Sequence, residues 1–148
     1  MRSTAREVVY KYLFSRNFNG EDPNLYRALL EDSSIKNDDK TFADALLKSI
    51  LNNYDELLNE VEKVVEGYKL DRIYTTDKCS LIMGIAELKY FDTPKAVVID
   101  EVVSLAGVYS TDKSVDFVNG VLAKYVKDLL WARRLSTVKL FRPSSKTN

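Results

Sequence analysis

The sequence predicts an all-α protein, a compact fold of about seven helices arranged as two small sub-bundles. Apolar residues recur every three or four positions along most of the chain, as they do on one face of a helix. Only five Gly and three Pro occur among 148 residues, which is too few for a turn-rich β fold. A hydrophobic content of 45% is typical of a folded globular protein, so residues 1–130 are expected to form one domain.

Three helices are predicted in the first third of the chain. The first begins near Ser3 or Thr4, and either hydroxyl could cap it. A short second helix follows a turn and runs from Pro23 to Leu30. Asp38, Asp39 or Thr41 is expected to cap the longer third helix. The apolar faces of the first and third helices comprise Ala5, Val8, Val9, Tyr12 and Leu13, and Phe42, Ala43, Leu46, Leu47, Ile50 and Leu51.

Two more helices are predicted before residue 90. One starts at Tyr54 and ends at Gly67, because Gly just past a periodic run is a common helix stop. Its acidic residues are interpreted as a solvated face. The other follows the capping cluster at 75–77 and starts at Lys78. Cys79 lies near this helix start, where it is either a thiol activated by the helix dipole or, as we favour, a packing residue.

A helical hairpin is predicted from Pro94 to Leu129. Pro94 suits the first position of a helix, and the polar break at 110–113 supplies caps for the second helix. Gly107 and Gly120 are expected to mark close packing of another backbone, so a larger side chain at 120 should destabilise the fold. Residues 131–148 are expected to form a basic C-terminal extension with a disordered end.

Several kinds of chemistry are excluded by what the sequence lacks. It contains no His, a single Cys and no Gly-rich phosphate loop. Nucleophilic triads, zinc clusters and nucleotide cofactor sites therefore have no residues to form them, and we expect neither an enzyme nor a cofactor. The absence of a long apolar run or a signal peptide, together with the lone Cys, favours a cytoplasmic protein without a membrane segment.

Charge is unevenly distributed, although the net charge is zero. Residues 1–16 carry a net charge of +3 and residues 124–148 a net charge of +6, which leaves −9 for the middle. Two basic ends on an acidic body indicate a localised surface for a polyanion. The alternative interpretation is that the basic ends only promote solubility.

The hairpin also carries a resemblance to a known family. Pro94-x-x-x-Val98-Ile99-Asp100-Glu101-Val102-Val103 is followed by Ser114-x-x-Phe117-Val118-Asn119-Gly120-Val121-Leu122. This pattern resembles the signature of the NusB family, whose members are small all-helical antitermination factors that bind RNA. The likeness extends over roughly residues 2–128, including Ala5-Arg6 in the first helix and Phe42, Leu46 and Leu47 in the third.

The resemblance implies a function in transcription. Members of the family bind the boxA element of nascent single-stranded RNA together with the small-subunit ribosomal protein called NusE, within the transcription elongation complex of rRNA operons. For this chain the implied RNA-binding residues are Arg2, Arg6 and Phe117. Arg6 is expected beside the buried face of its helix, with its guanidinium available to a phosphate. Phe117 is either a base-stacking aromatic or a core residue.

The resemblance also implies a protein interface. Phe14, Asp77 and Lys113 match partner-facing positions of the family, although Phe14 replaces the usual Tyr and Lys113 the usual Asp. Lys113 thus reverses a charge, which predicts a compensating change in the partner. The alternative function is a protein-interaction module or homodimer with weak or no RNA binding. A NusB-like domain also begins certain RNA cytosine methyltransferases, but no cofactor-binding domain follows here, so methyl transfer is not expected.

Overall fold

Seven α-helices and one short 3₁₀ helix form the part of the protein that the computed structural model describes, which is residues 2–67 and 70–141, with side chains through residue 136. No strand occurs in those ranges, and the predicted all-α class is confirmed. The elements are α1 (Ser3–Asn19), α2 (Pro23–Asp32), α3 (Asn37–Asn52), α4 (Tyr54–Val64), η1 (Leu70–Arg72), α5 (Thr75–Tyr90), α6 (Lys95–Tyr109) and α7 (Asp112–Phe141).

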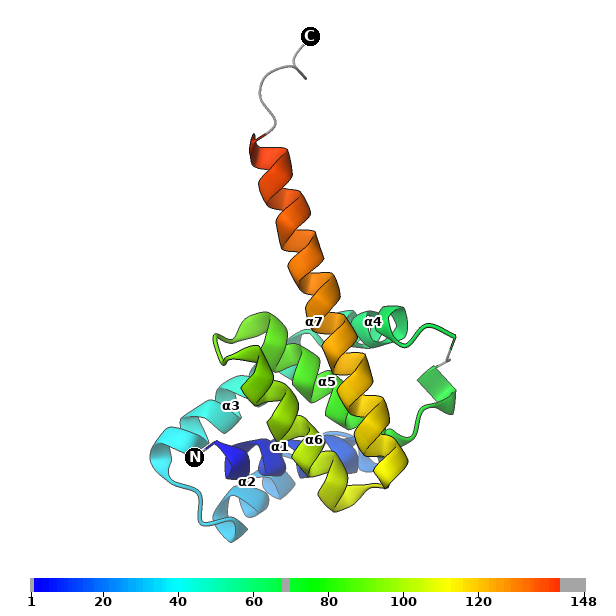
Figure 1. Cartoon of the computed structure of the whole chain (residues 1–148). Helices are drawn as coiled ribbons and strands as arrows, with labels where there is room; N and C mark the ends of the chain where they lie inside the picture. Colours follow the sequence, from blue (N-terminus) through cyan, green and yellow to red (C-terminus); the bar gives the residue numbers. More distant parts are fainter. Residues whose placement is uncertain (1, 68–69, 142–148) are drawn as a thin grey trace.

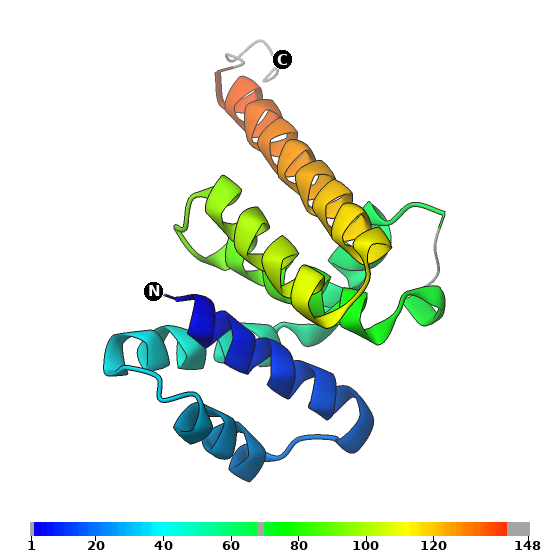
Figure 2. The ribbon, with the colours of Figure 1, turned by 60° about the horizontal axis from the view of Figure 1, so that its bottom comes forward.

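The helices form two groups that share α5 as their common neighbour. α1 packs against α2 and α3, whereas α6 and α7 pack against each other and against α5. α5 also contacts α1, α3 and α4, so it joins the two groups (Figures 1 and 2). The expected pair of small sub-bundles is therefore present, and it is held together through one central helix.

The sequence of α5 explains its central position. Every residue from 79 to 88 is buried, and a helix that is apolar on nearly all sides can be stable only in the core. Cys79 lies in this run, and burial raises the pKa of its thiol to about 12, although Lys78 opposes the shift. A thiol with this pKa is not activated, so Cys79 is the packing residue that the sequence favoured.

One of the four predicted caps forms, at the start of α7, and α2 has a cap that was not predicted. The Asp22 carboxylate accepts hydrogen bonds from the backbone N–H groups of Asn24 and Leu25 at the start of α2. The Thr111 hydroxyl accepts from the N–H of Ser114 at the start of α7. α1, α3 and α5 have no side-chain cap, because they begin at or before the residues proposed as caps and include those residues in the helix.

The two other predicted helix ends shift by a few residues. α4 ends at Val64, and Gly67 follows with φ +85°, a left-handed conformation that suits Gly. Pro94 lies one position before α6 rather than inside it.

Close packing occurs at a different Gly from those predicted. A Cβ on Gly84 of α5 would lie 3.0 Å from Leu122 Cδ1 and 3.5 Å from Val102 Cγ2. Gly84 thus allows α5 to approach α6 and α7. A Cβ on Gly120 would meet nothing within 4 Å, and one on Gly107 would make only an ordinary contact with Val115. The expectation of overpacking at 120 is wrong because Gly120 lies on the exposed side of α7.

α7 is much longer than the hairpin pattern predicted. It continues without a break past Leu129 to Phe141, and its C-terminal part extends beyond the other helices (Figures 1 and 2). The predicted extension therefore begins as a continuation of α7. Residues 143–148, for which disorder was expected, lie outside the described part of the chain.

The two Gly positions predict opposite effects on stability. Gly84→Val should lower the free energy of unfolding by about 1–3 kcal/mol, because the new side chain would overlap Leu122 and Val102. Gly120→Ala should raise it by about 0.5–1 kcal/mol, because an exposed helical position gains propensity without a clash. Urea unfolding followed by circular dichroism measures both changes, and a Gly84→Val protein as stable as the wild type would contradict this packing.

Candidate functional site

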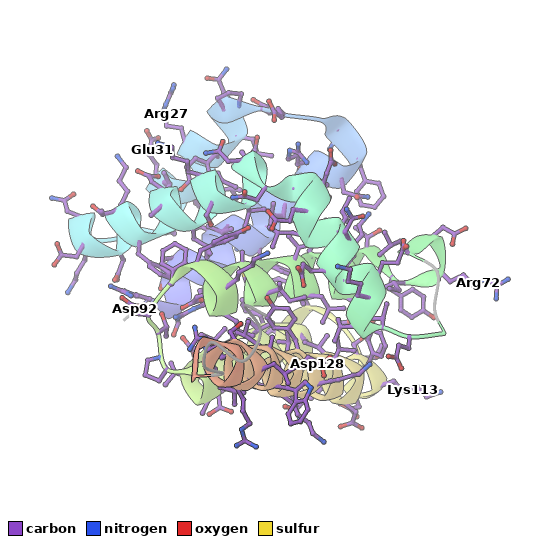
Figure 3. All side chains as sticks on the ribbon, turned by 90° about the horizontal axis from the view of Figure 1, so that it is seen from above. Arg27, Glu31, Arg72, Asp92, Lys113 and Asp128 are labelled. Carbon is purple, nitrogen blue, oxygen red and sulfur yellow. The ribbon has the colours of Figure 1, made fainter. Side chains whose placement is uncertain are left out.

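A groove of about 620 Å³ lies where the start of α5 meets the start of α7. It is lined by Arg72, Ile73, Tyr74, Asp77, Thr111, Asp112, Lys113, Ser114 and Phe117. Three of the six site residues proposed from the sequence, Asp77, Lys113 and Phe117, therefore lie together. The side chains of Arg72 and Lys113 extend outward on the same side of the molecule (Figure 3).

Asp77 is the most unusual residue of this groove. Its side chain is 5% exposed, and its Oδ1 atom has no hydrogen-bond partner within the described structure. Burial raises the pKa of the carboxyl above its usual range, while the Ser114 hydroxyl opposes this shift. A buried acceptor without a donor is costly, and a donor supplied by a binding partner would remove that cost.

The rim of the groove combines aromatic rings and cations. Tyr74 is 73% exposed at the rim of the groove. Phe117 is half-buried and packs against the core, so its ring serves both the core and the groove. Lys113 and Arg72 are exposed. Tyr74 was not predicted as a site residue. The available signal was its position as an aromatic residue directly before the 75–77 cluster.

The two proposed arginines lie elsewhere, around the start of α1. The Arg2 guanidinium lies 4.4 Å from the centroid of the Phe42 ring, within cation–π range. Arg2 and Arg6 line a second cavity of about 360 Å³ with Asp100 and Glu101, and this cavity shares no lining residue with the groove. The structure therefore does not bring Phe117 together with the arginines.

Arg6 lies beside the buried face of α1 as expected, but its guanidinium is not available to a phosphate. Its side chain is 3% exposed, and it donates to both carboxylate oxygens of Glu87, from Nε at 2.7 Å and from Nη2 at 2.6 Å. Nη1 donates to Glu101 at 3.0 Å. Desolvation lowers the pKa of Arg6, but Glu87 and Glu101 outweigh it, and the pKa lies above its ordinary value. The guanidinium is therefore a buried link from α1 to α5 and α6.

Glu87 and Glu101 were both missed as partners of Arg6. Glu87 is fully buried within the apolar run of α5. A carboxylate in such a position needs a cation nearby, and this was the signal that the sequence offered. Glu101 is also tied to α1 by a hydrogen bond that it accepts from the Ser3 hydroxyl.

Phe14, the third proposed partner-facing residue, does not line the groove. It is exposed on α1, where its ring meets that of the exposed Phe18 edge-on at 5.1 Å between centroids. Lys78 of α5 donates to Asn17 of α1 at 2.8 Å. This contact places the end of α1 beside the start of α5, the helix that carries Asp77.

The described residues contain neither a metal site nor a membrane-spanning helix. Within residues 2–67 and 70–141, no group of three or more Cys, Asp or Glu residues could hold a metal ion. Among the described helices, none is both long and apolar enough to cross a membrane.

The fold and the groove together define a small helical binding domain. A family profile described as the NusB family matches residues 3–127. The transcription antitermination protein NusB of Campylobacter hominis is 31% identical over 126 residues, which cover 85% of this chain and 96% of that protein. The chain belongs to the NusB family.

Solved structures agree with this assignment. A crystal structure of the antitermination factors NusB and NusE in complex with dsRNA matches with a TM-score of 0.78 and 28% identity, covering 86% of this chain and 96% of that chain. A structure of T. maritima NusB matches with a TM-score of 0.76 and 29% identity, covering 86% and 91%. The family profile ends within α7, so the projecting part of that helix lies outside the match.

The raised pKa of Asp77 predicts how stability depends on pH. Below the ordinary pKa of Asp, near 4, the carboxyl is protonated in both the folded and the unfolded chain. As the pH rises, the unfolded chain loses its proton first, so Asp77 disfavours folding at neutral pH. Asp77→Asn should therefore raise the melting temperature at pH 7, and the gain should shrink towards pH 4.

Thermal melts at both pH values measure this difference. Asp116→Asn on α7 is a suitable control, because Asp116 is exposed and should change stability little at either pH. If Asp77→Asn were less stable than the wild type at pH 7, the buried carboxylate would be making a favourable interaction and the argument would fail.

Proposed function

We propose that this protein is an RNA-binding transcription antitermination factor. In this proposal it binds boxA-like single-stranded RNA together with a NusE-type small-subunit ribosomal protein and acts on rRNA transcription within the elongation complex, in the cytoplasm. The observation that carries the proposal is the similarity of almost the whole fold to a chain of the NusB–NusE–dsRNA complex. No catalytic role is proposed, in line with a sequence that lacks His.

The groove is the proposed docking site for the ribosomal protein. A donor from the partner would satisfy Oδ1 of Asp77, and an apolar segment could cover the exposed ring of Tyr74. The Phe14–Phe18 pair would extend this surface along α1, because Lys78 joins the end of α1 to the start of α5. Lys113 at the rim favours a carboxylate on the partner, where the family's usual Asp would favour a cation.

The RNA is proposed to contact Arg2 and Phe117 at two separate places, with Phe117 at the rim of the groove that the ribosomal protein would occupy. Arg2 is exposed and can pair with a phosphate, whereas Phe117 can offer one side of its ring to a base. Arg6 acts as a positioning residue, because its guanidinium is already bound by Glu87 and Glu101. It fixes the start of α1 and stands 5.2 Å from the centroid of the same Phe42 ring that Arg2 covers.

Binding assays with and without the partner test this function. The chain and the ribosomal protein should form a heterodimer at micromolar concentration and bind a boxA-like RNA more tightly together than either does alone. Arg2→Glu should weaken RNA binding and reduce the magnitude of its salt slope, because one phosphate contact is lost. Asp77→Asn and Lys113→Glu should weaken the heterodimer and leave the fold intact.

Lys48→Glu provides the matched control, because Lys48 is exposed on α3 and lines neither cavity. Fluorescence anisotropy across a salt series and isothermal titration calorimetry give the two affinities. A chain that forms no complex with the ribosomal protein would contradict the partner proposal. A homodimer that binds no RNA, alone or with the partner, would instead support the interaction-module alternative.

A further inference from the structure

The projecting part of α7 carries an exposed surface that, apart from Lys127, lies beyond the end of the family match. Leu130, Trp131 and Leu135 are 51%, 57% and 44% exposed, although large apolar side chains are usually buried. Trp131 lies on the same face as Lys127, four residues before it, and Arg134, three residues after it. Lys127, Leu130, Trp131 and Arg134, together with Asp128 at the edge, surround a shallow depression along this face.

We propose that this face of α7, defined by Lys127, Trp131 and Arg134, is a second contact for single-stranded RNA. An exposed aromatic ring flanked by cations is how proteins hold single strands without reading their sequence: the ring stacks on a base, and the cations pair with the phosphates on either side. At 1.5 Å per residue, the two cations stand about 10 Å apart along the helix axis, with Trp131 between them. The inference rests on the proposed RNA-binding function.

The charge of the C-terminal sequence favours a polyanion as the occupant. After Asp128 no acidic residue occurs, whereas Arg133, Arg134, Lys139, Arg142 and Lys146 are all cations. This end of the chain is therefore positive, and RNA is the polyanion already implied by the fold.

A second copy of the chain fits this face less well. Lys127 and Arg134 lie in the middle of the exposed face rather than at its edges, so two such faces packed together would bring like charges close. A lipid surface fits less well for a related reason. An interfacial helix keeps its cations on the side opposite its apolar residues, and here both share one side.

The sequence offers a specific reporter, because Trp131 is the only Trp in the protein. Single-stranded RNA, both boxA-like and of mixed sequence, should quench its fluorescence in the full-length chain. Trp131→Ala should weaken RNA binding by about 5- to 150-fold, the range that corresponds to loss of one stacked base, whereas Trp131→Phe should retain most of it. Lys127→Glu/Arg134→Glu should lower the magnitude of the salt slope by about 1–2.

Lys40→Glu/Lys48→Glu on α3 is the charge-matched control and should retain higher affinity than the α7 double variant. If the wild type binds RNA without quenching of Trp131, and if the α7 variants bind as it does, this inference is overturned while the proposed function stands. If the wild type binds no RNA under any condition, both fail. A concentration-dependent dimer that Trp131→Ala abolishes, with RNA affinity unchanged, would identify the face as a self-association surface and overturn the inference.

Discussion

The buried ion pair between Arg6 and Glu87 is the interaction on which the arrangement of the two helix groups depends. The charged side chain of Arg6 or of Glu87 alone would be strongly unfavourable in the core, because both side chains are almost completely removed from water. Arg6 and Glu87 form two parallel charge-assisted hydrogen bonds, and Glu101 accepts a third hydrogen bond from Nη1 of the guanidinium. Because these bonds need correct geometry, the pair fixes how α1 lies against α5 and α6.

The proposed binding surfaces follow from that arrangement. α5 carries Glu87 near its end and Asp77 near its start, so the helix that anchors α1 also presents the groove. The guanidinium groups of Arg6 and Arg2 both lie over the Phe42 ring, so the start of α1 is also in contact with α3. In the proposed function, the buried Arg6 therefore positions its neighbours and does not itself contact RNA.

Much of the fold could be predicted from sequence periodicity, and the errors have identifiable causes. Apolar residues recur every three or four positions on the faces of α1 and α3 and in the α6–α7 hairpin. This pattern is local in sequence, so it could be recognised without the structure. Arg6 and Glu87 are 81 residues apart, so their pairing depends on tertiary packing that no local pattern encodes. Likewise, Gly84 rather than Gly120 allows close packing, because which side of a helix meets a neighbour depends on the whole bundle. The groove was partly predictable: the family resemblance pointed to Asp77, Lys113 and Phe117, but not to the exposed Tyr74.

A double-mutant cycle on Arg6 and Glu87 tests the central claim most directly. Arg6→Met and Glu87→Met should each lower the free energy of unfolding by about 3–5 kcal/mol, because each leaves a buried charge without its main partner. The double variant should be more stable than either single variant, because two apolar side chains can pack where the ion pair lay. If the two effects simply add, or if Arg6→Met abolishes RNA binding without loss of stability, Arg6 is not the structural link described here.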